Sequence, residues 1–66
     1  MKARVNGELR DLPDDTTVAA VLDLLGAPAR GVAVAVDGEV VPRAQWPSTV
    51  VPDGGTVEVL TAVQGG

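Results

Sequence analysis

The sequence contains no cysteine and no histidine among its 66 residues. Their absence excludes disulfide bonds and zinc sites of the usual thiolate and imidazole type. It also removes a thiol nucleophile and a histidine general base, on which much covalent and acid–base catalysis depends. We therefore expect the chain to bind no metal and no cofactor. We expect it to enter a reaction as a substrate or carrier, and not as an enzyme.

Basic residues are few. The chain has five lysines and arginines and nine aspartates and glutamates, which gives a net charge of −4. They are scattered and form no run, which argues against nucleic acid as a partner. No apolar stretch approaches the roughly 18–20 residues of a membrane span, and the first residues lack the apolar region of a signal peptide. We expect a cytoplasmic protein that binds neither nucleic acid nor membrane.

Aromatic residues are almost absent, since Trp46 is the only one. A core must therefore be built from valine, leucine and alanine. We expect Trp46 to cover one edge of that core, with its indole N–H bonded to a nearby acceptor, and a role in docking a partner is the alternative. A chain of this length forms one small domain, which buries only about 60% of its unfolded surface. We place this domain at residues 1–62 and expect it to be a monomer by itself.

Two turn dipeptides organise the strands. Asn6-Gly7 and Asp37-Gly38 each stand between short runs of strand-forming residues, and such pairs favour hairpin turns because both positions need φ > 0. The last strand follows the turn-forming run Asp53-Gly54-Gly55. The predicted strands cover residues 2–6, 8–12, 32–36, 39–41 and 56–62, with a short edge strand at 44–46.

One helix is predicted after the first hairpin, over residues 17 to 25 or 26. Apolar side chains recur there at the spacing of a single helix face. They are Val18, Val21, Leu22 and Leu25. Asp15 or Thr16 can cap the first turn by accepting from its free amides. Gly26 fits the left-handed residue that often ends a helix, and Pro28 prevents continuation.

The order of hairpin, helix, hairpin and strand predicts an α+β roll. A single helix covers only one face of a sheet. The first and last strands are long enough to lie centrally, paired in parallel with the helix crossing between them. Val32, Val34 and Val36 then face the helix.

The opposite face of the sheet holds a candidate partner-binding surface. Single exposed apolar residues are common, but Leu60 lies on the strand that leads into the final residues. By alternation it shares its face with Ala33, Ala35 and Ala62. Arg43 is a further partner-binding candidate, or else a solvated charge on an edge strand.

The chain ends in Gly65-Gly66. Glycine has no Cβ, so another protein's active site can enclose such a segment closely. An α-carboxyl group, with a pKa of about 3.3–3.7, is ionised at neutral pH. It can attack an activated phosphate or be held by an anion site. We expect a flexible tail over residues 63–66, comprising Val63, Gln64, Gly65 and Gly66, with a reach of roughly 13 Å at about 3.3 Å per residue.

These features together resemble the ubiquitin-like β-grasp fold and, within it, the ThiS family, the sulfur carriers of thiamin thiazole synthesis. The resemblance covers the whole chain and implies a mixed sheet of four to five strands with one main helix at about 17–26. It is carried by Val5-Asn6-Gly7-Glu8, Thr16-Thr17-Val18, the run from Val34 to Arg43, Trp46 and Ala62-Val63-Gln64-Gly65-Gly66.

The resemblance implies a carrier function for Gly66. A partner of the ubiquitin-activating type uses ATP to convert the Gly66 carboxylate to an acyl adenylate. A sulfur donor system then replaces AMP by sulfur, and thiazole synthase takes sulfur from the thiocarboxylate. The absence of cysteine fits, because no side chain can carry the sulfur. The alternative functions are those of a small subunit like that of molybdopterin synthase, a natural-product sulfur carrier, a ubiquitin-like protein tag, or a plain β-grasp binding module.

Overall fold

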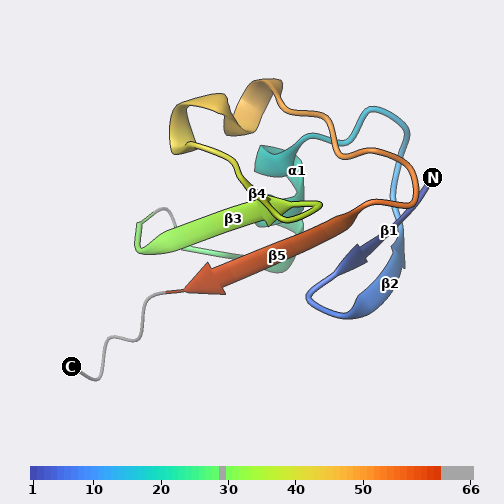
Figure 1. Cartoon of the computed structure of the whole chain (residues 1–66), viewed down its shortest axis with the longest axis horizontal. Coiled ribbons are helices and arrows are strands. Elements are labelled where there is room, and N and C mark those ends of the chain that lie inside the picture. The colour runs from blue at the N-terminus through green and yellow to red at the C-terminus, as the bar shows by residue number, and fades with distance from the viewer. Residues whose placement is uncertain (29, 62–66) are drawn as a thin grey trace.

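The computed structural model describes residues 1–28 and 30–61. Ala62 and the expected tail at 63–66 lie outside the described residues. In chain order the elements are β1 (Lys2–Val5), β2 (Glu8–Asp11), α1 (Val18–Leu25), β3 (Val32–Val36), β4 (Glu39–Val40), the 3-10 helix η1 (Arg43–Ser48) and β5 (Thr56–Thr61). The strands form one five-stranded sheet, and α1 packs across one of its faces (Figure 1).

The sheet has the order β2-β1-β5-β3-β4. Strand β1 pairs with β5 in parallel, while β2 pairs with β1 and β3 pairs with both β4 and β5 in the antiparallel sense. The first and last strands therefore lie side by side, with the helix in the connection between them. This arrangement confirms the predicted α+β roll.

Helix α1 begins after Thr17, whose hydroxyl accepts a hydrogen bond from the Ala20 N–H at 3.2 Å. The predicted caps, Asp15 and Thr16, are wrong. Asp15 adopts a left-handed conformation with φ of 63° in the preceding turn, and the buried Thr16 hydroxyl donates back into that turn. Gly26 ends the helix in the left-handed conformation with φ of 66°, as the sequence predicts.

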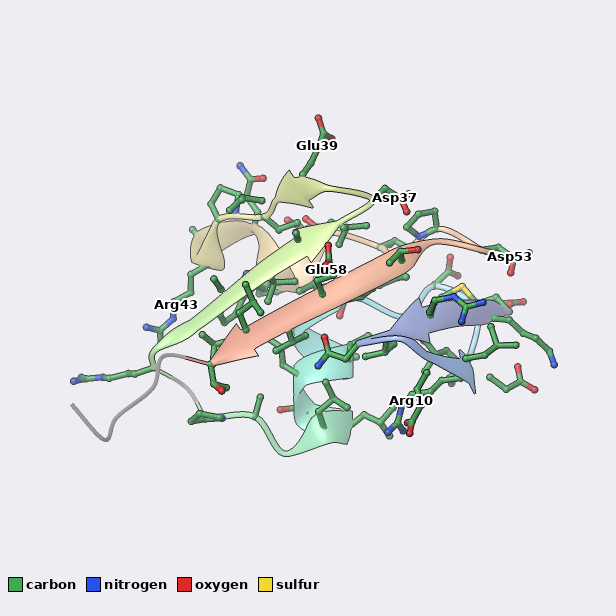
Figure 2. The ribbon with its side chains drawn as sticks, turned by 60° about the horizontal axis from the view of Figure 1, so that its bottom comes forward. Arg10, Asp37, Glu39, Arg43, Asp53 and Glu58 are labelled. Carbon is green, nitrogen blue, oxygen red and sulfur yellow. The ribbon has the colours of Figure 1, made fainter. Side chains whose placement is uncertain are left out.

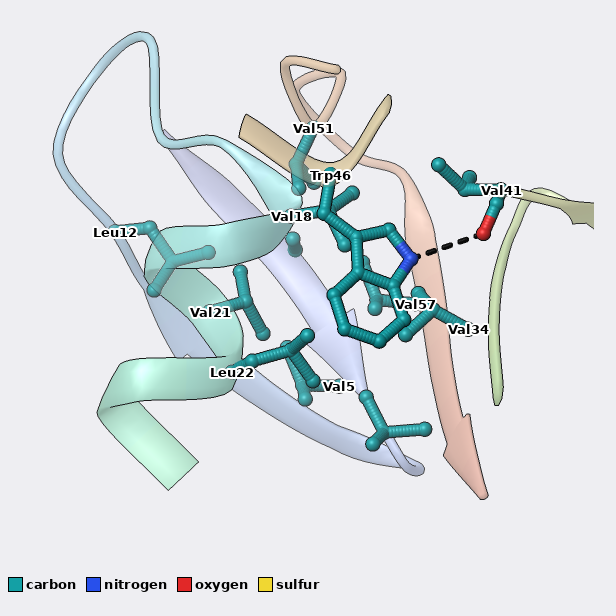
Figure 3. Packing of buried hydrophobic residues seen from close by; sticks show 12 residues of the cluster. Val5, Leu12, Val18, Val21, Leu22, Val34, Val41, Trp46, Val51 and Val57 are labelled. Carbon is teal, nitrogen blue, oxygen red and sulfur yellow. Dashed lines mark hydrogen bonds between the residues drawn. The ribbon is translucent and has the colours of Figure 1, made fainter. Parts of the chain in front are cut away.

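The predicted edge strand at 44–46 is wrong, because η1 occupies this segment. In the helical turn, the indole Nε1–H of Trp46 donates to the Val41 carbonyl at 2.9 Å (Figure 3). Trp46 is only 9% exposed and belongs to the apolar core. A regular strand would send consecutive side chains to opposite faces, whereas the 3-10 turn holds the indole on the core. The predicted role of Trp46 as a cover with a local acceptor is confirmed.

The core lies between the sheet and α1 and consists almost wholly of valine and leucine. Val34 is 1% exposed, and Val32 and Val36 are partly buried beside it, so the predicted helix-facing side of β3 is confirmed. The buried apolar residues of the described chain are Ala3, Val5, Leu12, Val18, Val21, Leu22, Val34, Val41, Trp46, Val51, Val57 and Val59 (Figure 3).

The first residue of each hairpin turn also accepts a hydrogen bond from the backbone of β5. Asn6 and Asp37 adopt the left-handed conformation with φ of 50°, and each precedes a glycine. The Asn6 Oδ1 accepts from the Val59 N–H at 2.8 Å, and the Asp37 Oδ1 accepts from the Thr56 N–H at 2.9 Å. The two turns thus satisfy backbone groups of β5 that the neighbouring strands do not reach.

Candidate partner-binding surface

The sheet face away from α1 carries the exposed apolar residues that the sequence singles out. The buried side chains of β5 point toward α1, and the alternate side chains point away. Leu60 is 67% exposed on this outer face, which confirms its predicted position. Ala33 of β3 lies directly opposite Leu60, and Ala35 lies opposite Glu58. The structure therefore brings Leu60, Ala33 and Ala35 together on one surface.

Val40 adds to this surface, and the sequence analysis missed it. It pairs with Ala35 across β3 and β4 and is 76% exposed. The signal was present in the sequence, because a two-residue turn at 37–38 places residue 40 opposite residue 35, and opposite residues share a face. We call the surface made by Ala33, Ala35, Val40 and Leu60 the sheet patch.

Glu58 is a charged side chain at the sheet patch. It follows the same alternation on β5 as Leu60 and stands opposite Ala35. Figure 2 shows its carboxylate standing off β5 on the open face of the sheet. A complementary protein surface would therefore offer apolar side chains together with one cationic group placed to meet Glu58.

A shallow hollow of about 340 Å³ adjoins the sheet patch where β3 begins and β5 ends. Thr61, the last described residue of the chain, lies at its margin. The hollow is lined by Gly31, Val32, Ala33, Leu60 and Thr61. A bound partner that covers Leu60 would thus lie beside the point where the chain continues toward its final residues.

Arg43 lies apart from the sheet patch. It is the first residue of η1 and not part of an edge strand, so the predicted element is wrong. Its side chain lines a different groove of about 240 Å³ between α1 and η1, together with Leu22 and Trp46. A docking role for Arg43 would therefore involve the helix side of the molecule, and it stays a prediction.

The remaining predicted site residues, Ala62, Val63, Gln64, Gly65 and Gly66, lie outside the described residues. Within residues 1–28 and 30–61, no three potential metal ligands gather into a group. In the same part of the chain, no helix has the length and apolar character needed to cross a membrane.

A mixed sheet with parallel central strands and a single helix across one face is the β-grasp fold of ubiquitin-like proteins. The model of the ThiS family matches residues 3–66, and the chain belongs to this family.

Two solved structures are similar to the chain over its full length. One is the crystal structure of a thiamine biosynthesis protein (ThiS) from Geobacter metallireducens, with 35% sequence identity, a TM-score of 0.84 and complete coverage of both chains. The other is the NMR solution structure of a thiamine biosynthesis protein from the same organism, with 36% identity and a TM-score of 0.81. The match to the NMR structure covers 100% of this chain and 88% of that chain.

A longer relative is also similar to the whole chain. It is a protein named thiazole synthase from Paramagnetospirillum magneticum, 38% identical over 66 residues. The match covers 100% of this chain but 20% of the relative, so the chain spans about a fifth of the relative's length.

Proposed function

We propose that this chain is a sulfur carrier of thiamin biosynthesis, which accepts sulfur on the Gly66 carboxylate and delivers it to the thiazole ring. The observation that carries the proposal is the ThiS family match over residues 3–66, since it includes the Gly-Gly end as well as the β-grasp domain. The chain acts as a carrier and as a protein substrate, while its partners perform the catalysis.

The proposed chemistry has two steps: the Gly66 carboxylate oxygen first attacks the α-phosphorus of ATP, and sulfur then substitutes at the carbonyl carbon. A carboxylate is a poor electrophile, so the activating enzyme joins it to the α-phosphate of ATP and releases pyrophosphate. Sulfur that the donor system releases at the oxidation level of hydrosulfide then attacks the carbonyl carbon, the C–O bond to AMP breaks, and AMP leaves as the C–S bond forms. The product is a thiocarboxylate, and the absence of cysteine leaves this terminus as the place where the chain can hold sulfur.

The relative from Paramagnetospirillum magneticum supports thiazole synthase as the receiving partner. That protein is named thiazole synthase, and about a fifth of its length corresponds to this whole chain. A carrier and an enzyme that act in sequence gain effective concentration when they are joined in one polypeptide.

A direct test is incubation of the 66-residue chain with the adenylating enzyme, ATP and a sulfur donor. The expected result is a mass increase that corresponds to replacement of one oxygen by sulfur, located on Gly66 by fragmentation. Omission of ATP is the control and should leave the mass unchanged. Formation of lysine-linked conjugates without a thiocarboxylate would contradict the proposal and indicate a protein tag.

We further propose that the sheet patch docks the activating enzyme. Replacement of Leu60 by aspartate should leave folding unchanged, because the side chain is 67% exposed. It should weaken binding to the enzyme by more than about 1 kcal/mol, since it places a carboxylate in an apolar contact. Calorimetric titration measures the affinity, and thermal unfolding checks the fold.

The matched control for Leu60→Asp is Leu24→Asp, because Leu24 is similarly exposed at 56% but lies on α1. This control changes the net charge by the same amount and should bind like the wild type. Equal loss of affinity in both variants would indicate a general charge effect and remove the sheet patch from the interface. Unfolding of Leu60→Asp would show that Leu60 belongs to the core.

A further inference from the structure

Strand β5 runs past the end of its parallel neighbour. On one side β3 pairs with β5 as far as Thr61, but on the other side β1 pairs with it only as far as Val57. Figure 1 shows β5 continuing beyond the end of β1 toward the C-terminal end of the chain. Among the described strands, the final residues of β5 thus have a neighbour on one side only.

The backbone groups on the β1 side belong to alternate residues of this segment. The carbonyl of Gly55 accepts from the Arg4 N–H, and the carbonyl of Val57 accepts from the Asn6 N–H, both at 2.9 Å. The next group on this side is the Val59 N–H, which donates to the Asn6 side chain at 2.8 Å. Within the described part of the chain, Asn6 therefore supplies the last hydrogen bond on this edge.

Two groups follow on the same edge, the Val59 carbonyl and the Thr61 N–H. Within residues 1–28 and 30–61, neither has a hydrogen-bond partner. The chain turns away from β5 at Asn6-Gly7, so β1 cannot reach them. Both sheet faces are open here, because Leu60 on one face and Thr61 on the other are exposed. Unpaired strand groups of this kind are a template for pairing with another chain.

We propose that the backbone of Val59 to Thr61 pairs with an extended segment of the activating enzyme by strand addition. This inference rests on the proposed function, which requires that enzyme to reach Gly66. β5 is the last described element before Gly66 in the sequence, and only five residues follow Thr61, so an enzyme that encloses Gly66 comes close to the end of β5. Main-chain pairing would orient β5 relative to the enzyme's active site. It uses backbone groups only, so the Leu60 side chain stays free to contact the enzyme.

The edge is prepared for this pairing before the partner arrives. β5 is fixed by β3 on one side and by Asn6 on the other, so strand addition orders little additional chain. Asn6 also sets the register. Its side chain occupies the Val59 N–H, and the incoming segment can pair only from the Val59 carbonyl onward.

The test uses Thr61→Pro, which removes the N–H on the open edge. The hydrogen bonds of β5 to β3 are made by Glu58 and Leu60, which alternate with Val59 and Thr61, so the substitution removes no donor from the β3–β5 pairing. Proline is tolerated where the N–H side of a strand faces solvent. We expect unchanged thermal unfolding and affinity for the activating enzyme about tenfold lower, the loss of roughly one hydrogen bond. Thr61→Val keeps the N–H and should bind like the wild type.

Amide hydrogen exchange on the wild-type chain gives an independent readout. The Thr61 amide should exchange rapidly in the free protein and become protected in the complex with the enzyme. Wild-type affinity for Thr61→Pro, or a Thr61 amide that exchanges equally fast in the complex, would overturn the proposal. If Thr61→Pro fails to fold, the exchange experiment alone decides. Failure of the proposed function looks different, because the wild-type chain would then form no thiocarboxylate, whether or not it binds the activating enzyme.

Discussion

Deletion of Gly66 is expected to abolish thiocarboxylate formation while the fold stays intact. Under the proposed function, the shortened chain would place its carboxylate about 3.3 Å short of the reacting position, the length of one extended residue. The fold should persist because the buried core cluster is built from residues between Ala3 and Val59. Mass spectrometry after incubation with the activating enzyme, ATP and a sulfur donor measures the reaction, and thermal unfolding measures stability.

Replacement of Gly65 by valine tests the same site without a change of length. A β-branched side chain would have to enter the channel that two glycines leave open, and its stiff χ1 rotamer limits any adjustment. We expect a loss nearly as large as that of the deletion. Gly65→Ala adds only a methyl group and should lose less activity. Continued sulfur transfer to the deletion variant would show that the carrier site lies elsewhere.

Replacement of Leu22 by alanine should lower the free energy of unfolding by about 2–5 kcal/mol, the usual cost of a large-to-small change in a core. Leu22 is 7% exposed on the buried face of α1. The loss is a large share of the roughly 5–15 kcal/mol that stabilises a typical domain. Val34→Ala, at a β3 position only 1% exposed, removes fewer atoms and should cost somewhat less.

The control for Leu22→Ala is Leu24→Ala, because Leu24 lies on the same helix and is 56% exposed. It should change the unfolding free energy by no more than about 0.5 kcal/mol, as surface substitutions usually do. Urea unfolding followed by the fluorescence of Trp46 reports on all three variants. A Leu22→Ala midpoint equal to that of the wild type would show that the helix face is assigned wrongly.

The features that the sequence predicts correctly depend on residues that are close to one another along the chain. Asn6-Gly7 and Asp37-Gly38 predict the two hairpin turns, because the left-handed conformation observed there is accessible to few residue types. The apolar periodicity of α1 and the left-handed Gly26 depend on contacts within a few residues of the chain. The exposure of Leu60 follows from the alternation of a single strand.

The start of α1 depends on a contact that local patterns do not encode. Three consecutive residues, Asp15, Thr16 and Thr17, are all capable caps. The segment after η1 crosses the helix start, where the Val18 N–H donates to the Thr49 carbonyl and the Val51 N–H donates to the Thr16 carbonyl. These long-range bonds fix Thr16 in the preceding turn and leave Thr17 as the cap.

By itself the sequence determined the turns, the helix face and the outward position of Leu60. The turns follow from residue types that adopt the left-handed conformation, and the two faces follow from the periodicity of side chains along one helix or strand. Only the tertiary structure decided that residues 43–48 form η1, since the Trp46 indole must reach both the core and the Val41 carbonyl. It also decided where the open edge of β5 begins. That edge depends on the register of β1 against β5. These strands are the first and the last in the sequence, so local patterns do not determine their register.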